Sequence, residues 1–157
     1  MFGGSAISEQ LFEVVSALVP DGGKILEFGS GEGTRELLKR WEVTSVEHNP
    51  KYYVNREHTI PVTLDRETGW YHEDRVKIAL NQGPFDLVII DGPPGKARGS
   101  IRIKLFEDIS CPVIFDDVNR WIDRDAMRRF CKALGYEFEI IKGKEKDFAI
   151  CRKDENQ

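Results

Sequence analysis

The chain has 157 residues, 40% hydrophobic and 32% charged, which is typical of a globular protein with one core. Its formal net charge of −4 gives no global basic field to attract nucleic acid or a membrane surface. No apolar run approaches the roughly 18 residues of a membrane span, and the first ten residues lack the pattern of a secretory signal. The three cysteines, without a C-x-x-C pair, indicate free thiols in a reducing compartment. We therefore expect a single cytoplasmic domain over residues 1–157.

Segments of helical periodicity alternate with short apolar runs along the chain. Helices are predicted over residues 6–19, 32–41, 51–57, 72–83, 100–109 and 123–135. Strands are predicted over residues 24–29, 43–48, 59–64, 85–91 and 111–117, with a closing hairpin at 136–143 and 147–153. Ser8 suits the N-cap of the first helix and Gly135 the end of the last, while Pro61 places the third strand near an edge.

Alternation of strands and helices predicts a parallel sheet covered on both faces. The hairpin reverses the last strand. The expected fold is therefore α/β, a three-layer, doubly wound, seven-stranded sheet, mostly parallel with an antiparallel last strand. Ligands of such sheets bind at the carboxyl ends of the strands.

The segment "KILEFGSGEGT" combines a strand, an acid and a glycine-rich turn. It lacks the lysine of a phosphate-binding loop, and Thr34 stands where a dinucleotide loop has its third glycine. Glu27 would repel a pyrophosphate but favour an ammonium or sulfonium group. Glu47 ends the second strand, 18 positions after Gly29, where a carboxylate can accept both hydroxyls of a ribose. A ligand with a ribose, a positive amino-acid end and no phosphates is indicated, and S-adenosylmethionine fits that description.

The segments "LEFGSGEGT", "SVEHNP", "FDLVIIDGPPG" and "VIFDDV" resemble the successive cofactor-side motifs of class I S-adenosylmethionine-dependent methyltransferases. The closing hairpin is similar to the antiparallel seventh strand of that family, and the resemblance runs from about Ile7 to Lys153. It implies methyl transfer from S-adenosylmethionine, with these cofactor-binding residues: Glu27 near the ammonium group; Gly29, Ser30 and Gly31 against the methionine part; Glu47 on the ribose; His48 and Asp65 near the adenine; and Asp91 facing the methyl group.

Acidic residues also follow the fourth and fifth predicted strands, at Asp91, Asp116 and Asp117. Catechol-type O-methyltransferases are similar here, with an Asp and an Asp-Asn pair that hold a divalent cation, although this chain has Asp117 in place of the Asn. Carboxylate oxygens are ligands that Mg²⁺ prefers, so a magnesium site is one hypothesis. The alternative is that these acids accept hydrogen bonds from loop amides or helix N-termini.

The resemblance gives Asp91 and Asp116 as candidate catalytic residues. His72, which follows the third predicted strand near the cofactor side, is a further candidate as a general base near neutral pH, or it is simply an exposed loop residue. Trp70 and Tyr71 would pack over the adenine or the acceptor entrance. The loop "DGPPG" lacks the aromatic residue of nucleobase methyltransferases, so a small-molecule acceptor, methylated at oxygen, is favoured.

A basic run follows this loop, with Lys96, Arg98, Arg102 and Lys104. It would select an anionic acceptor, or it is a solvated helix start. The acceptor would be held by loops alone or by a partner subunit, including a second copy in a homo-oligomer. Two rival functions stay open: a non-catalytic module that binds S-adenosylmethionine or a protein partner, and an NAD-dependent oxidoreductase.

Overall fold

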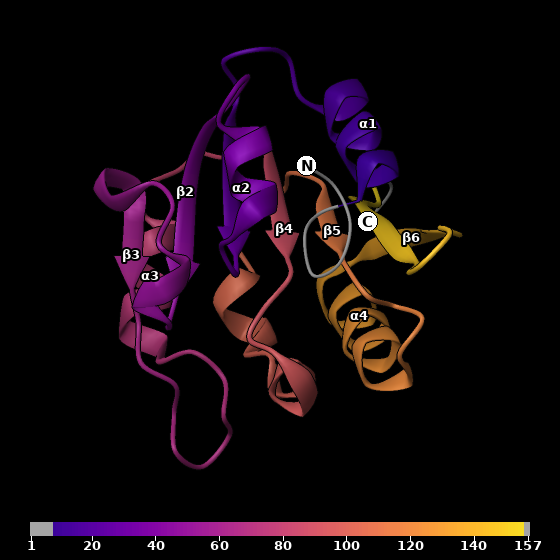
Figure 1. The fold of residues 1–157 in the computed structure, drawn as a ribbon. Coiled ribbons are helices and arrows are strands. Elements are labelled where there is room, and N and C mark those ends of the chain that lie inside the picture. Colours follow the sequence, from indigo (N-terminus) through magenta and orange to yellow (C-terminus); the bar gives the residue numbers. More distant parts are fainter. Residues whose placement is uncertain (1–7, 156–157) are drawn as a thin grey trace.

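The structure, a computed structural model, describes residues 8–155 and contains a seven-stranded sheet (Figure 1). The strand order from edge to edge is β3-β2-β1-β4-β5-β7-β6. Strands β1 to β5 are parallel, and β7 runs antiparallel to both of its neighbours. The expected doubly wound sheet with a reversed last strand is confirmed. The strands are β1 Lys24–Phe28, β2 Glu42–Glu47, β3 Thr59–Pro61, β4 Leu87–Ile90, β5 Val113–Phe115, β6 Tyr136–Ile141 and β7 Phe148–Lys153.

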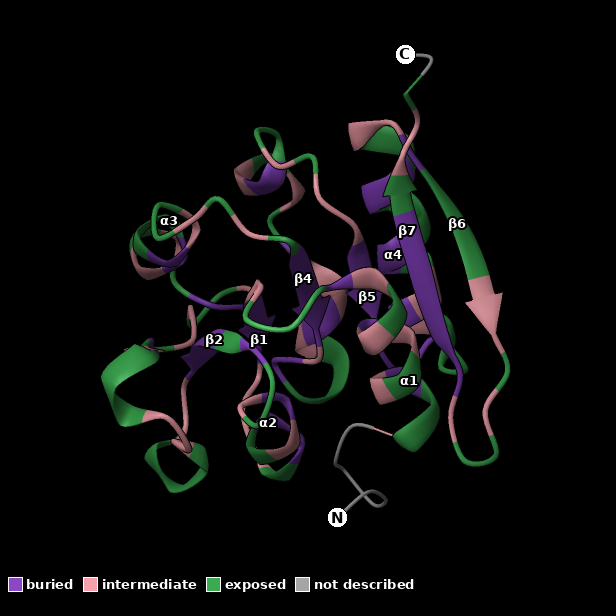
Figure 2. Ribbon diagram, turned by 90° about the horizontal axis from the view of Figure 1, so that it is seen from above, coloured by how far each residue is buried: buried purple, intermediate pink, exposed green. Residues whose placement is uncertain are grey.

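Four α-helices of the described residues cover the sheet on both faces, which gives three layers (Figure 2). They are α1 Glu9–Leu18, α2 Glu32–Leu37, α3 Glu73–Leu80 and α4 Trp121–Leu134. Alternate strand residues point to opposite faces, so Leu26 and Phe28 join the core under α3 and α4, while Ile25 joins the core under α1 and α2. Glu27 therefore points toward the α2 side, as Ile25 does.

The predicted helix over residues 100–109 is wrong. One 3-10 turn, Gly95–Ser100, ends where the helix was expected to begin, and a second, Ile103–Phe106, follows after two residues without helical structure. Ile101 and Phe106 are both buried, and a spacing of five residues would place them on different faces of one α-helix. The irregular path brings both side chains to the same core. The expected helical piece at 51–57 likewise consists of two 3-10 turns, Pro50–Tyr52 and Arg56–His58.

The local signals at the element ends are confirmed. The Ser8 side chain accepts a hydrogen bond from the Leu11 amide at 3.2 Å and caps α1, although the first two residues of the predicted helix lie outside the described range. Gly135 ends α4 with a φ of 72°, and Pro61 lies in the edge strand β3. The three cysteines are free thiols. Across residues 8–155, each helix is too short or too polar to cross a membrane.

Candidate functional site

A cavity of about 640 Å³ opens at the carboxyl ends of β1, β2 and β4. Most of the predicted site residues lie on its wall, namely Glu27, Gly29, Ser30, Gly31, Glu47, His48, Asp91 and Asp117. A larger groove of about 980 Å³ runs between α3 and residues 101–111. Arg102 and Lys104 of the basic run line it, but none of the predicted catalytic, cofactor-binding or metal-binding residues does. The chemistry that the sequence indicates is therefore gathered in the smaller cavity.

The glycine-rich turn after β1 serves two different purposes. Gly29 has a φ of 96°, and a Cβ atom there would lie 2.9 Å from the Asp91 carbonyl oxygen. Glycine at this position lets the ends of β1 and β4 approach each other. Gly31 differs, because a Cβ atom there would meet no described atom within 4 Å. Gly31 thus borders open space in the cavity, where a ligand can approach the backbone.

Glu27 is a buried carboxylate whose partners are hydroxyl groups. Its Oε1 accepts hydrogen bonds from Thr34 Oγ1 and from Ser45 Oγ, the latter at 2.7 Å. Burial raises the pKa of Glu27 from 4.5 to about 7, with a smaller contribution from the nearby charge of Glu47, and the two hydroxyl bonds oppose this rise. Glu27 is therefore balanced between its neutral and charged forms near pH 7, and a cation in the cavity would favour the charged form.

Glu47 fixes the loops at the ends of β1 and β2. Its Oε1 accepts a hydrogen bond from the Ser30 amide at 2.9 Å, and its Oε2 accepts one from the Asn49 amide at 2.7 Å. His48 Nδ1 lies 3.2 Å from the same Oε2. A carboxylate has about four acceptor positions, so both oxygens keep acceptor capacity for a ligand. The side chain is held rigidly at the cavity wall.

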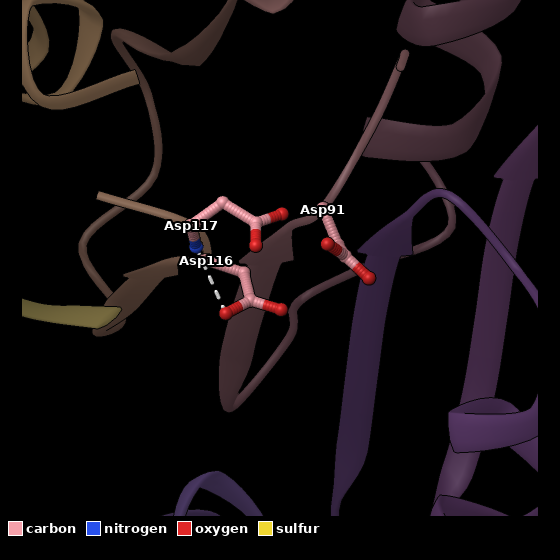
Figure 3. A group of neighbouring side chains, drawn as sticks. All are labelled: Asp91, Asp116 and Asp117. Carbon is pink, nitrogen blue, oxygen red and sulfur yellow. Dashed lines mark hydrogen bonds between the residues drawn. The ribbon is translucent and has the colours of Figure 1, made fainter. Parts of the chain in front are cut away.

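The three acids after β4 and β5 converge as the sequence predicts (Figure 3). Ligand oxygens of Asp91, Asp116 and Asp117 lie within 4.8 Å of one another. Asp116 is fully buried, and its Oδ1 accepts a hydrogen bond from the Asp117 amide at 2.9 Å. Burial and the charge of Asp116 raise the pKa of Asp91 well above its usual range. The Asp91 carboxyl therefore holds a proton more tightly than an exposed aspartate does.

Cations of the chain itself neutralise this acid cluster. Lys146 Nζ lies 2.7 Å from Asp116 Oδ2 and 3.9 Å from Asp117 Oδ1. Arg98 Nη1 lies 2.9 Å from Asp117 Oδ2, and its Nη2 lies 3.8 Å from Asp91 Oδ1. Arg120 adds a third cation, with its Nη2 3.2 Å from Asp117 Oδ2. Each carboxylate of the cluster thus has a cation within 4 Å.

These residues do not fit a divalent cation. Each of the three carboxylates already has an ammonium or a guanidinium group of the chain within 4 Å. A divalent ion would have to compete with these fixed positive charges for the same carboxylates and would be repelled by them. The geometry therefore supports the grouping of the three acids and does not support the magnesium hypothesis.

Arg98 holds the loop after β4 rather than facing an acceptor. Its side chain is buried, and it donates hydrogen bonds to the carbonyl oxygens of Asp91 at 2.9 Å and Pro93 at 3.3 Å. Its Nη1 also lies 3.2 Å from Asp123 Oδ1 in α4. The sequence hypothesis that Arg98 grips an anionic acceptor is thus replaced by a role in shaping the loop. Lys96 is exposed, and Arg102 pairs with Glu73 on the surface.

Three predicted residues do not reach the cavity wall. The Asp65 carboxylate accepts hydrogen bonds from the amides of Glu67 and Thr68 in a turn. His72 is exposed at the N-cap of α3. Asp116 lies behind the wall and contacts it through Lys146. Asp65 thus stabilises a turn, His72 is an exposed residue at a helix start, and neither lines the cavity.

The aromatic residues after β3 pack into the core. Trp70 is fully buried, and Tyr71 is 2% exposed. Both pack against Phe28, and Tyr71 also lines the cavity. Only Tyr71 of this pair is therefore near a ligand, and Trp70 supports it from beneath.

Sequence reasoning missed several residues of the site. In the sequence, Thr34 serves only to exclude a dinucleotide loop. In the structure, its hydroxyl donates a hydrogen bond to Glu27 and accepts one from the Gly31 amide at 3.0 Å. An inward-facing serine in an apolar strand, as at Ser45, was the available signal for a buried polar contact. Lys146 lies in a charged turn and carries no local signal, since its partner Asp116 is 30 positions away.

Comparison with known proteins connects this geometry to a fold. No family model matches the chain, and no curated protein matches its sequence. Solved structures do match. A candidate caffeoyl-CoA O-methyltransferase from Staphylococcus aureus superposes with a TM-score of 0.56 at 15% identity, over 93% of this chain and 82% of the other. A methyltransferase from Pyrococcus furiosus gives 0.55 at 17% identity, over 90% and 80%. The SAH-bound Podospora anserina methyltransferase PaMTH1 gives 0.51 at 15% identity, over 85% and 72%.

These similarities show that the chain has the class I methyltransferase fold. Identities this low establish the fold alone. What the chain does must be argued from the chemistry of its own cavity.

The raised pKa of Glu27 predicts how stability depends on pH. The folded state holds the proton up to about pH 7, while the unfolded state releases it near pH 4.5, so the free energy of unfolding falls as the pH rises between these values. The loss is about 3 kcal/mol. Glu27→Gln should remove it, so that the variant gains about this much relative to the parent between pH 5 and pH 8 in urea unfolding. Glu42→Gln, at an exposed position of β2, is the control. Parallel pH profiles for parent and Glu27→Gln would contradict the assignment.

The buried contacts of Arg98 predict a structural defect on its removal. Arg98→Met removes the buried cation that Asp117 and Asp123 share and leaves them the half-exposed Arg120, and it frees the carbonyl oxygens of the loop, so the free energy of unfolding should fall by about 3 kcal/mol. Thermal and urea unfolding measure this directly. The neighbouring exposed Lys96→Met should change stability by less than about 0.5 kcal/mol. Equal stability of the two variants would show that Arg98 does not hold the loop.

Proposed function

We propose that this chain, which has the class I methyltransferase fold, binds S-adenosylmethionine in the cavity and transfers its methyl group to a small-molecule acceptor. The observation that carries the proposal is the pair of buried acids, Glu27 and Glu47, on either side of the glycine-rich turn. Their negative charge favours a ligand with ammonium and sulfonium groups and disfavours a phosphate-bearing one.

The shape of the cavity supports the same ligand. Its volume of about 640 Å³ is within the range of ligand pockets, and the open space at Gly31 admits a close approach to the backbone. The remaining acceptor capacity of Glu47 suits a pair of ribose hydroxyls, and Glu27 would face the ammonium group. His48 lies beside Glu47 on the wall, as a residue near the adenine would.

The far end of the cavity supplies the acid–base chemistry. When bound, S-adenosylmethionine supplies an activated methyl group. The chain's own part is to orient the acceptor and to remove its proton. Asp91 lines the cavity with a raised pKa, and its carboxylate is the group best suited to take a proton from an acceptor hydroxyl. An oxygen nucleophile on a small molecule is therefore the acceptor that we propose.

Calorimetry with S-adenosylhomocysteine tests the proposal, because this product keeps the ribose and the ammonium group. Binding of S-adenosylhomocysteine without binding of NAD supports it. Binding of NAD alone would favour the oxidoreductase, and binding of neither would remove the proposal's basis. A screen of hydroxyl-bearing metabolites with radiolabelled S-adenosylmethionine then separates an enzyme from a binding module.

Substitution at Glu47 tests where the ribose lies. Glu47→Gln keeps the size of the side chain, but its amide nitrogen cannot accept the hydrogen bonds that one carboxylate oxygen accepts. We expect binding of S-adenosylhomocysteine to weaken by about 10- to 100-fold, since a hydrogen bond to a charged group contributes roughly 1.5–3 kcal/mol. Glu42→Gln is again the matched control. Calorimetry that finds equal affinity for Glu47→Gln and the parent would place the ribose elsewhere.

A further inference from the structure

The side chain of Lys146 brings a positive charge to the acid cluster of Asp91, Asp116 and Asp117. It lies in the turn between β6 and β7, yet its side chain is only 10% exposed and reaches the ends of β4 and β5. Its ammonium group contacts Asp116 at 2.7 Å and also lines the cavity that Asp91 lines. Lys142, on the same hairpin, has a side chain that is 77% exposed and pairs with Asp147 near the surface. The burial of Lys146 is thus particular to its position.

The charge of Lys146 is fixed by its surroundings. Burial alone would lower the pKa of this lysine, but the carboxylates of Asp116 and Asp91 outweigh burial and raise the pKa above its usual value. The ammonium group has three donors, and Asp116 accepts one of them. A charged group with donors to spare therefore lines the same cavity as the proton acceptor Asp91.

In this arrangement a positive charge lies next to carboxylates, as a metal ion does in a metal site. A divalent cation among three carboxylates would bind an acceptor oxygen and stabilise its deprotonated form. Here the Lys146 ammonium group lies 2.7 Å from Asp116 and 3.9 Å from Asp117, two of the three carboxylates, and can act on an oxygen in the same way, with a fixed tether in place of exchangeable coordination. Arg98 neutralises the opposite side of the cluster and is fully engaged in the loop.

We propose that Lys146 fills the cation position of the acid cluster and meets the acceptor oxygen there, so that the protein needs no metal ion. The part that concerns the acceptor rests on the proposed function. As the acceptor O–H bond breaks, its electron pair stays on the oxygen beside the Lys146 ammonium group, and the proton bonds to the Asp91 carboxylate. Lys146 keeps its own proton throughout.

Removal of the lysine tests this assignment without a methyl donor. Lys146→Met keeps an unbranched side chain of similar length but removes the positive charge. Thermal unfolding is measured with millimolar MgCl₂ or MnCl₂ and with EDTA. We expect the melting temperature of the parent to be the same in metal and chelator, while Lys146→Met is less stable in EDTA and regains stability in metal. Lys142→Met should respond like the parent. The double variant Lys146→Met/Asp116→Asn, which lacks the central carboxylate, should lose the metal response.

Each outcome decides the assignment. A parent stabilised by millimolar metal, or a Lys146→Met chain with no metal response, would overturn it. If Lys146→Met does not fold in EDTA, the assignment requires that metal restore a cooperative transition, and a chain that stays unfolded contradicts it. Calorimetry with S-adenosylhomocysteine on the parent reports separately on the proposed function, so a failure of either claim leaves the other recognisable.

Discussion

The burial of carboxylates at the ends of parallel strands is the constraint on which the site depends. The doubly wound topology gathers the ends of β1, β2, β4 and β5 at one edge, and each of these ends carries an acid. A buried carboxylate must be neutralised, paired with a cation or hydrogen-bonded. How each acid meets this requirement determines what its part of the cavity can bind.

The two ends of the cavity meet the requirement differently. After β4 and β5, cations of the chain itself pair with the acids, and Arg98 and Lys146 are the buried ones. At β1 and β2 the partners are hydroxyls and backbone amides, which leave Glu27 and Glu47 attractive to a cation from outside. One half of the cavity thus already carries cations of the chain, while the other half favours a positively charged ligand. A cofactor with an ammonium and a sulfonium group matches the second half.

Local sequence patterns predicted the parts of this arrangement that depend on strand ends. Glu27, Glu47 and Asp91 could be placed because each follows a recognisable apolar run, and parallel strands bring such ends together. The partners of these acids could not be placed. Lys146 approaches Asp116 only after the hairpin folds back on β5. Arg98, in the loop before the predicted helix, meets Asp117 and Asp123 only after β5 and α4 pack beside that loop. The positions of both side chains depend on contacts between distant segments, which the periodicity of the sequence does not predict.

Proton release on ligand binding tests the central claim most directly, namely that buried negative charge at the ends of β1 and β2 awaits a cation. With a pKa of about 7, Glu27 is about half protonated at pH 7 in the free protein. Calorimetry of S-adenosylhomocysteine binding at pH 7, in buffers of different ionisation enthalpy, counts the protons exchanged. The ammonium group of the ligand should drive off about half a proton, and Glu27→Gln should abolish this release. Binding with no proton exchange, or with proton uptake, would contradict the account.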